Sequence, residues 1–410
     1  MIRLIRSLLF AGLMAGAVGG VRADEEADLR AKLLKYNTIT GTEALNGQFR
    51  DLIKNKADAK KVLAAAAKIA KEKNQPFNYN AALLMGRFAQ SQKDYELAKM
   101  FFGICSDQAT KVQSATKLAD TLENMISLYS ASKEYAKAVE VCQEFLKLEA
   151  DEDSPIERSK VLIVAQMAQI LARSGKTKEA LKIVDNILDN EEGNWFFMRV
   201  RGFVLREAEK YDDAVEAFNE TIVRLEKNKQ MPEMLRNNFV RDTKYILSSI
   251  YIDAKKPDKS IELLEALVKE DAENPTYAND LGFVLADNDK RLDEAEKLIR
   301  SALEKDKARR KKADDTDPTD NSSYLDSLAW VLFKQKKFAE AKKIMLEVVK
   351  DNEDGSNVEI LDHLADIHSA LGEKKEAIEV WERAMKEEPI GKRDKERKLK
   401  IEEKLKAAKK

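Results

Sequence analysis

Histidine and cysteine, which serve most often as metal ligands and nucleophiles, are scarce in this sequence. The chain of 410 residues contains two of each. His363 and His368 are five residues apart in one helical segment, whereas two imidazoles that share a metal from one helix stand four apart. We therefore expect no metal site, and His368 is expected to be a packed core residue. No cofactor is expected either, because no cofactor-binding motif is present.

Carboxylates offer another route to catalysis. Asp362 and Asp366 are four residues apart and share a helix face. A carboxylate-based enzyme, or a small-ligand-binding protein that uses these acids, is therefore an alternative function. The Gly-rich phosphate loop and the HExxH and GxSxG motifs are missing from the sequence, and acidic faces are common on exposed helices. We accordingly expect a protein without catalytic residues.

The composition indicates a helical protein with balanced charge. Charged residues make up 35% of the chain, while Gly and Pro, which interrupt helices, number 15 and 7. Lys and Arg total 72, against 73 Asp and Glu. Since there is no excess of positive charge to neutralise phosphates, nucleic acid is not expected as a partner.

Residues 1–23 have the three-part layout of a secretory signal peptide. Arg3 and Arg6 precede an apolar stretch from Ser7 to Gly20, and the predicted cleavage follows Ala23. An uncleaved membrane anchor is the alternative, although this stretch is shorter than the roughly 20 residues that a spanning helix needs. We expect an exported protein, periplasmic or secreted, that is not inserted in the membrane after cleavage.

A pattern of small and large residues recurs along the chain with a basic period of about 34 residues. Eight copies align on a small residue, at Ala98, Ala138, Ala180, Ala214, Ser260, Ala295, Ala341 and Ala377. Twelve or thirteen residues earlier stand Gly86, Ile126, Ala168, Gly202, Ser248, Gly282, Ala329 and Ala365. Four residues later stand Phe102, Cys142, Val184, Phe218, Leu264, Ile299, Met345 and Trp381. Two small residues on facing helices let the backbones approach, and the large residue fills the space beside them, so each copy predicts a helix hairpin.

This pattern resembles the tetratricopeptide repeat, which has Gly or Ala at its eighth position, Ala at its twentieth and a large apolar residue at its twenty-fourth. The resemblance covers about residues 79–389 and includes Pro389 at the thirty-second position of the last copy. It implies an all-α fold, a right-handed α-solenoid of about eight stacked helix hairpins with helical caps.

Four segments depart from the repeat pattern. Residues 24–78 are expected to form an N-terminal helical cap, and residues 390–410 a charged C-terminal capping helix, for which attraction to an anionic membrane is the alternative. Extra residues near 225–238 are helical in character, whereas those near 305–323 predict a solvated loop. The basic run from Arg309 to Lys312 in that loop is an alternative docking site.

The resemblance also implies where a partner binds. In this family, positions 2, 5, 9, 12 and 13 of each repeat line a groove that holds an extended peptide or a helix, and we call these the groove positions. The expected partner is therefore another protein or peptide. The expected binding residues are Phe196, Arg199, Phe203, Arg206, Tyr245, Phe283, Trp330, Phe333 and Lys334. Packing against the neighbouring repeat is the alternative role for each. Asp326, Glu359, Asp362 and Asp366 make the C-terminal end of the groove acidic.

The C-terminal half, with its YLDSLAWVLF and LDHLADIHSALG segments, is similar to repeat proteins of the bacterial cell envelope. This similarity implies a non-catalytic scaffold or adaptor in the envelope. Cys105 and Cys142 fall on the second helices of successive hairpins, which the intervening helix should hold apart. We expect two buried free thiols, with a disulfide as the alternative.

Overall fold

The computed structural model describes residues 25–38, 49, 52–53, 56–72, 77–312, 320–351, 357–389 and 391–410. Within these residues the regular structure is helical throughout, which confirms the all-α prediction. The predicted signal peptide, residues 1–23, lies outside the described residues.

Eight helix hairpins follow one another along the chain. They are α4 (Tyr79–Ser91) with α5 (Tyr95–Lys111), α6 (Ala115–Ala131) with α7 (Tyr135–Leu146), α8 (Pro155–Arg173) with α9 (Thr177–Asn190), α10 (Trp195–Glu207) with α11 (Tyr211–Lys227), α12 (Glu233–Asp253) with α13 (Pro257–Glu270), α14 (Pro275–Asp287) with α15 (Leu292–Lys312), α16 (Ser322–Lys334) with α17 (Phe338–Asp351), and α18 (Val358–Ala370) with α19 (Lys374–Lys386). Successive helices pack against each other from α4 to α8 and from α10 to α19, as a stacked repeat array requires.

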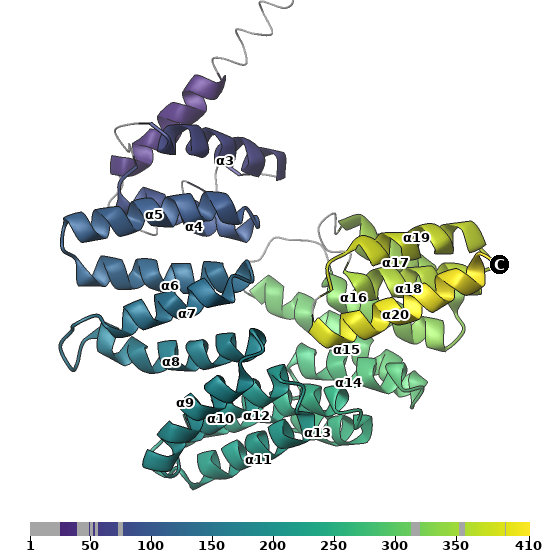
Figure 1. Cartoon of the computed structure of the whole chain (residues 1–410). Coiled ribbons are helices and arrows are strands. Elements are labelled where there is room, and N and C mark those ends of the chain that lie inside the picture. Colours follow the sequence, from purple (N-terminus) through teal and green to yellow (C-terminus); the bar gives the residue numbers. More distant parts are fainter. Residues whose placement is uncertain are drawn as a thin grey trace, which may run out of the picture. The chain divides into compact units, whose positions relative to one another are not determined.

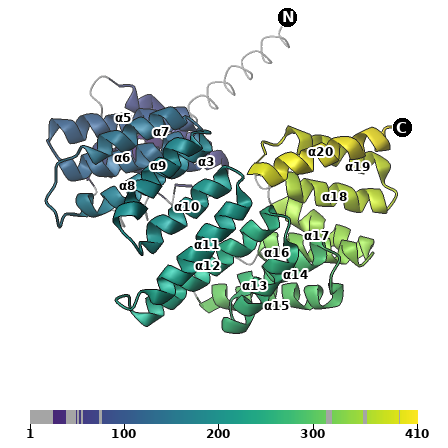
Figure 2. The same ribbon diagram turned by 60° about the horizontal axis from the view of Figure 1, so that its bottom comes forward.

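The chain forms two compact units, Met1–Ile187 and Leu188–Lys410, whose boundary lies within α9. The first, unit 1, contains a helix over residues 25–35, the short helix η1 (Tyr36–Thr38), α3 (Lys56–Ala70) and the first three hairpins. The second, unit 2, contains the hairpins from α10 to α19 and a last helix, α20 (Gly391–Ala408). Figures 1 and 2 show the helices of each unit in succession by colour.

The close packing predicted within each hairpin is confirmed. All eight aligned small residues of the second helices are no more than 1% exposed. A Cβ atom added at Gly86 would lie 2.5 Å from Cε1 of Phe102, and one at Gly202 would lie 2.5 Å from Cε2 of Phe218. The large residue therefore lies directly over the backbone of the small residue on the facing helix, which fixes how the two helices cross.

The turn between the two helices has the same form in all eight hairpins. The residue that follows the C-cap has a positive φ in each turn: Lys93, Lys133, Gly175, Glu209, Lys255, Asp289, Lys336 and Gly372. The next amide N–H donates to a carbonyl of the preceding helix, for example from Asp94 to Ala89 at 2.9 Å. This arrangement is that of a Schellman motif, and it brings the second helix back along the first each time. The turn between α14 and α15 has a second residue with a positive φ, Arg291.

Polar caps define where the first helix of a hairpin begins. In seven of the eight hairpins an Asn or Ser side chain accepts a hydrogen bond from the first turn, at Asn78, Ser114, Ser154, Asn194, Asn274, Asn321 and Asn357. Such a cap contributes about 1 kcal/mol to the helix that it starts. The helix α12, which begins after Pro232, is the exception.

Both insertions lengthen helices that border them: α11 and α12 at the first, and α15 at the second. The first is divided between the end of α11 and the start of α12. The prediction that Arg309 to Lys312 lie in a solvated loop is wrong, because they form the last turn of α15. Basic side chains are favoured there by the negative end of the helix dipole, and Arg310 also pairs with Asp306 one turn earlier at 2.9 Å. Residues 313–319 lie outside the described residues.

The two cysteines are unpaired and buried, as expected. Burial raises the pKa of both thiols, Cys105 and Cys142, to about 12. Both side chains are thus protonated packing residues at neutral pH.

Candidate functional site

The last helix of the chain lies on groove positions of unit 2. The helix α20 packs against α18 and α19, where Figures 1 and 2 both show it. Its apolar contribution is small: Ile401 is fully buried, Leu405 is half-buried, and Leu399 is 64% exposed. Ion pairs accompany this small apolar contact between α20 and the hairpins.

Three carboxylates of α18, which we call the acidic cluster, receive two cations from α20. The cluster consists of Glu359, Asp362 and Asp366, at groove positions 2, 5 and 9 of the last hairpin. Lys404 Nζ lies 2.7 Å from carboxylate oxygens of both Asp362 and Asp366. Arg397 donates to Asp362 at 3.3 Å and to Glu359. The interval from Arg397 to Lys404 equals that from Glu359 to Asp366, so the charges of the two helices match in register.

Asp362 is the most enclosed member of the acidic cluster. Its side chain is 4% exposed, and it also accepts a hydrogen bond from Trp381 Nε1 at 3.2 Å. Burial, followed by the charge of Asp362, raises the pKa of Asp366, although Lys404 opposes this shift. These two acids, proposed as catalytic in the alternative function, are thus the counter-ions of a lysine from the same chain.

The first turns of α20 contact hairpins that are distant in sequence. Arg393 pairs with Asp253 at 2.6 Å and donates to the carbonyl oxygen of Ser249 at 2.8 Å. These residues stand at groove positions 13 and 9 of the hairpin formed by α12 and α13. Glu396 pairs with Lys255 at 2.7 Å. One helix therefore connects α12 to α18 within unit 2.

Four of the nine predicted binding residues lie near the imidazole of His363. Trp330 stacks on His363 with ring centroids 4.0 Å apart and on Phe333 at 5.0 Å, and Phe283 lies 6.3 Å from His363. Lys334 lies 5.3 Å over the Trp330 ring and pairs with Asp289. Trp330 is 7% exposed and its Nε1 donates to Asp287 at 3.1 Å. Its ring is consequently part of the core of unit 2.

His363 and Asp326 form a buried pair beneath this stack. The imidazole is fully buried, and its Nδ1 lies 3.0 Å from Oδ1 of Asp326. Burial alone would lower the pKa of His363, but the charge and hydrogen bond of Asp326 outweigh it, so the pKa is raised. The Nε2 atom has no hydrogen-bond partner among the described residues. Asp326 is therefore paired with a histidine and is separate from the acidic cluster.

Three further predicted binding residues lie together on α10. Phe203 packs edge-on against Phe218 at 5.1 Å, and the Arg199 guanidinium lies 5.7 Å from the centre of the Phe203 ring. Phe196 contacts the rings of its sequence neighbours Trp195 and Phe197. Burial lowers the pKa of Arg199, whose Nε has no hydrogen-bond partner within the described chain.

The last two predicted binding residues each contact an aspartate of the next hairpin. Arg206 pairs with Asp253 at 3.1 Å, so this carboxylate lies between Arg206 and the Arg393 of α20. The hydroxyl of Tyr245 donates to Asp280 at 2.6 Å. The nine residues thus do not form one site: four lie around the Trp330 stack, three lie on α10, and Arg206 and Tyr245 contact different aspartates. Arg206 shares its carboxylate with α20.

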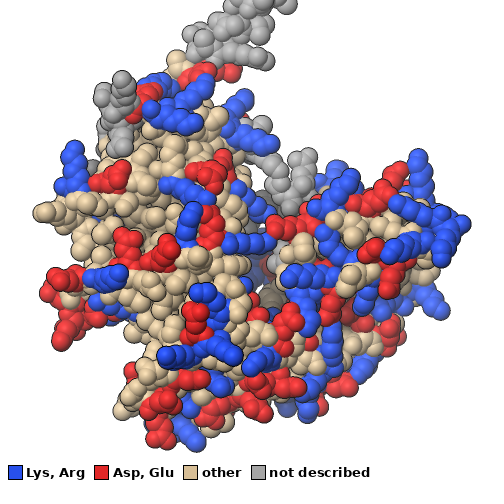
Figure 3. All heavy atoms as spheres, viewed as in Figure 1, with Lys and Arg blue, Asp and Glu red and all other residues tan. Residues whose placement is uncertain are grey.

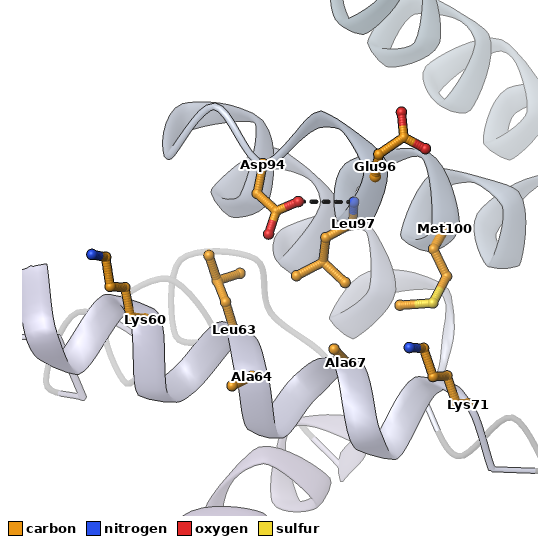
Figure 4. A pocket seen from close by; sticks show the side chains of 9 residues that line it. All are labelled: Lys60, Leu63, Ala64, Ala67, Lys71, Asp94, Glu96, Leu97 and Met100. Carbon is orange, nitrogen blue, oxygen red and sulfur yellow. Dashed lines mark hydrogen bonds between the residues drawn. The ribbon is translucent and has the colours of Figure 1, made fainter.

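A surface pocket of about 420 Å³ lies in unit 1 between α3 and α5 (Figure 4). Its apolar wall includes Leu63 and Met100, and charged residues such as Lys71 line it as well. The carboxylate of Asp94 accepts the backbone N–H of Leu97 at 3.1 Å and so caps α5. This acid therefore serves the helix, and the other charged residues of the lining, Lys60, Lys71 and Glu96, carry both signs of charge.

The face of the molecule in Figure 3 carries basic and acidic side chains interspersed, with Lys and Arg gathered along α20 at the right. Among the described residues, every helix is too short or too polar to cross a membrane.

Family models match three parts of unit 2. Each is described as a tetratricopeptide repeat, and they cover residues 247–310, 322–354 and 358–390. They therefore include the acidic cluster, the Trp330 stack and the end of α12. No curated protein matches the chain.

Several solved structures are similar to the chain. A tetratricopeptide repeat protein from Parabacteroides merdae is 15% identical, with 71% of this chain and 99% of that chain covered and a TM-score of 0.49. MamA from Desulfovibrio magneticus is 16% identical over 48% of this chain and 97% of that one, at 0.36. YrrB, described as having an unusual peptide-binding site, is 16% identical over 59% and 97%, at 0.34. With TM-scores below 0.5, these likenesses say nothing about what this chain binds.

Proposed function

Because this chain is a tetratricopeptide-repeat protein, we propose that it is a non-catalytic scaffold that holds a peptide or helix of another protein on the groove positions of unit 2. Repeats of this family generally bind other proteins. The signal-like residues 1–23 support a setting in the bacterial cell envelope, where the chain is exported and acts as an adaptor.

One observation carries the proposal: a helix already lies on these positions. Ser249, Asp253, Glu359, Asp362 and Asp366, the groove residues that α20 contacts, belong to two different hairpins. The side chains at these positions thus have the spacing and charge to hold a helix. A helix of another protein with similar chemistry fits the same residues.

The alternative, a carboxylate enzyme, has less support. Its two proposed acids both pair with Lys404, Asp362 also pairs with Arg397, and α20 lies over them. A general acid or base must reach a substrate within hydrogen-bond distance, and here the chain itself takes that place.

Site-specific photo-crosslinking in the native envelope tests the scaffold function. A photoreactive residue at Asp242 or Ser323, two exposed groove positions, should capture a partner protein. The same residue at Lys375, which is 84% exposed on α19, is the matched control and should capture little. Equal capture at all three sites, or none at the groove positions, would contradict the proposal.

Export is tested separately on the same preparations. We expect the chain to be released with the periplasmic or secreted fraction and to begin at Asp24. A chain that retains Met1 and remains with the cytoplasmic fraction would overturn the proposed location.

A further inference from the structure

We infer that α20 is a displaceable occupant of the groove positions of unit 2, and that the partner segment that replaces it is a basic amphipathic helix. This partner helix has two cations seven residues apart with an aliphatic residue between them, as Arg397, Ile401 and Lys404 are arranged in α20. The inference rests on the scaffold function proposed above and names the chemistry of the partner and the regulation of its access.

The contact that holds α20 is mainly electrostatic. Its pairs with the acidic cluster and with Asp253 involve basic side chains that are between 21% and 52% exposed. Pairs of this kind weaken as salt screens them. Since Ile401 is its only fully buried apolar side chain in the described structure, α20 has little hydrophobic attachment. A second helix with the same charges can therefore compete with it.

The desolvation of Asp362 also favours exchange. Enclosing this carboxylate removes it from water, and the attraction of Lys404 and Arg397 has to offset that cost. When α20 leaves, the carboxylate regains water and is not left as an isolated buried charge. The bound and released forms are thus closer in free energy than the number of ion pairs suggests.

The charge pattern selects a basic helix over other partners. Glu359 and Asp366 are two helical turns apart, about 10 Å along the axis, which is the spacing of Arg397 and Lys404. An extended peptide rises about 3.3 Å per residue, so its side chains would need a different spacing to meet the same acids. An acidic helix would place like charges against the cluster.

The two helices of the hairpin beneath α20 also pack closely against each other. Ala365, Ala377 and Trp381 pack between α18 and α19 and are no more than 3% exposed. The link from Lys386, the end of α19, to Gly391 is short, so α20 competes at a high effective concentration, on the millimolar scale for short linkers. A partner must therefore bind tightly, or be present in excess, to take its place.

A peptide of residues 391–410, labelled with a fluorophore and added in trans, is the probe for this exchange. The full-length chain with Arg397→Ala and Lys404→Ala should bind the peptide about tenfold more tightly than the wild-type chain, because its own helix no longer fills the positions. Adding Asp362→Asn and Asp366→Asn to that variant should remove the binding.

A matched variant controls for the loss of two positive charges. Lys395 and Lys400 are exposed on α20, so Lys395→Ala with Lys400→Ala should bind the peptide as weakly as the wild type. No binding by any variant would show that α20 is a permanent cap, and equal binding by all would show that the peptide binds elsewhere; either result overturns the inference. A released variant that forms a dimer would instead show that the occupant is α20 of a second copy, which also overturns the inference.

Hydrogen exchange of the wild-type chain provides a second measurement that needs no variant. Amides of α20 should exchange at least about tenfold faster than those of α18. Raising the salt concentration should accelerate exchange in α20 and leave exchange in α18 unchanged. Equal protection of the two helices would contradict displacement. Capture of a partner at Asp242 without peptide binding would leave the scaffold function standing and this inference wrong. Peptide binding without capture at Asp242 would support displacement of α20 and contradict the scaffold function.

Discussion

Polar side chains at the groove positions have different hydrogen-bond and ion-pair partners in units 1 and 2. In unit 1 they pair between neighbouring hairpins: Arg87 donates to Asp120 at 2.9 Å, and Gln90 donates to Ser127 at 2.9 Å. In unit 2, carboxylates at the same positions also pair with α20, which is distant in sequence.

The difference lies in charge and enclosure. Arg87 and Asp120 have side chains 48% and 38% exposed, so water solvates both and their pair contributes at most about 1 kcal/mol. Asp362 in unit 2 is nearly enclosed and has two cations near it. The same repeat pattern thus supports a self-contained polar face in one unit and a face that requires a counter-ion in the other.

The largest expected effect comes from removing a ring at a groove position of unit 2. Trp330→Ala should lower the free energy of unfolding by about 3 to 5 kcal/mol, because the ring is buried and stacks on His363 and Phe333. The matching change in unit 1, Arg87→Ala, should cost less than about 1 kcal/mol. Denaturant unfolding measures both. Similar losses would mean that groove positions do not differ in enclosure between the units.

Both units share the close contact between a small residue of the first helix and a large residue of the second. Adding a methyl group at the small residue tests this contact. Gly86→Ala in unit 1 and Gly282→Ala in unit 2 should each cost about 1 to 3 kcal/mol, since a Cβ would meet Phe102 at 2.5 Å and Ile299 at 2.6 Å. Gly103→Ala is the control, because a Cβ there meets nothing within 4 Å and Ala favours the helix. It should raise the thermal midpoint. If the two crowded variants were as stable as the wild type, the helices would not be fixed by this contact.

The sequence predicted the hairpins well because their signal is local. The small residue of each first helix, the anchor twelve or thirteen residues later and the large residue four beyond it meet within one hairpin. Trp330 shows where this reasoning stops. Its groove position suggests a binding residue, yet its ring is buried, because His363 and Phe333 enclose it from other turns and another hairpin.

The place of α20 depends on pairs that are far apart in the chain. Arg393 meets Asp253 across 140 residues, and no periodicity connects them. One signal was available in the sequence: Arg397 and Lys404 have the same interval as Glu359 and Asp366. The loop prediction for Arg309 to Lys312 was wrong for a different reason. A run of basic residues is favourable in a solvated loop, but it is also favourable in the last turn of a helix.

Opposite responses to pH are expected of the two units. The raised pKa of His363 means that the pair with Asp326 stabilises unit 2 fully below about pH 6.5 and that this stability is lost as the pH rises through the folded-state value. In unit 1, hydrogen bonds from Lys137 and Lys99 lower the pKa of Glu134 to about 2. That contribution is present above the unfolded value of about 4.5 and is lost as the pH falls towards 2.

An NMR titration of His363 measures the unit 2 response directly. In Asp326→Asn the histidine pKa should fall, because burial then acts without the opposing carboxylate. The stability of this variant should no longer decrease as the pH rises above about 6.5. An unchanged histidine pKa in Asp326→Asn would show that the carboxylate is not its determinant.

The smallest expected effect concerns the turns, which the units share. Lys93 in unit 1 and Lys336 in unit 2 have φ values of 60° and 64°, where a side chain costs about 1 to 2 kcal/mol and Gly costs none. Gly also loses about 0.5 to 1 kcal/mol of backbone entropy on folding, so Lys93→Gly and Lys336→Gly should each stabilise the protein by at most about 1.5 kcal/mol. Lys255→Gly should gain less, because Lys255 pairs with Glu396 of α20. If Lys255→Gly gained as much as the other two in denaturant unfolding, that pair would contribute nothing to holding α20.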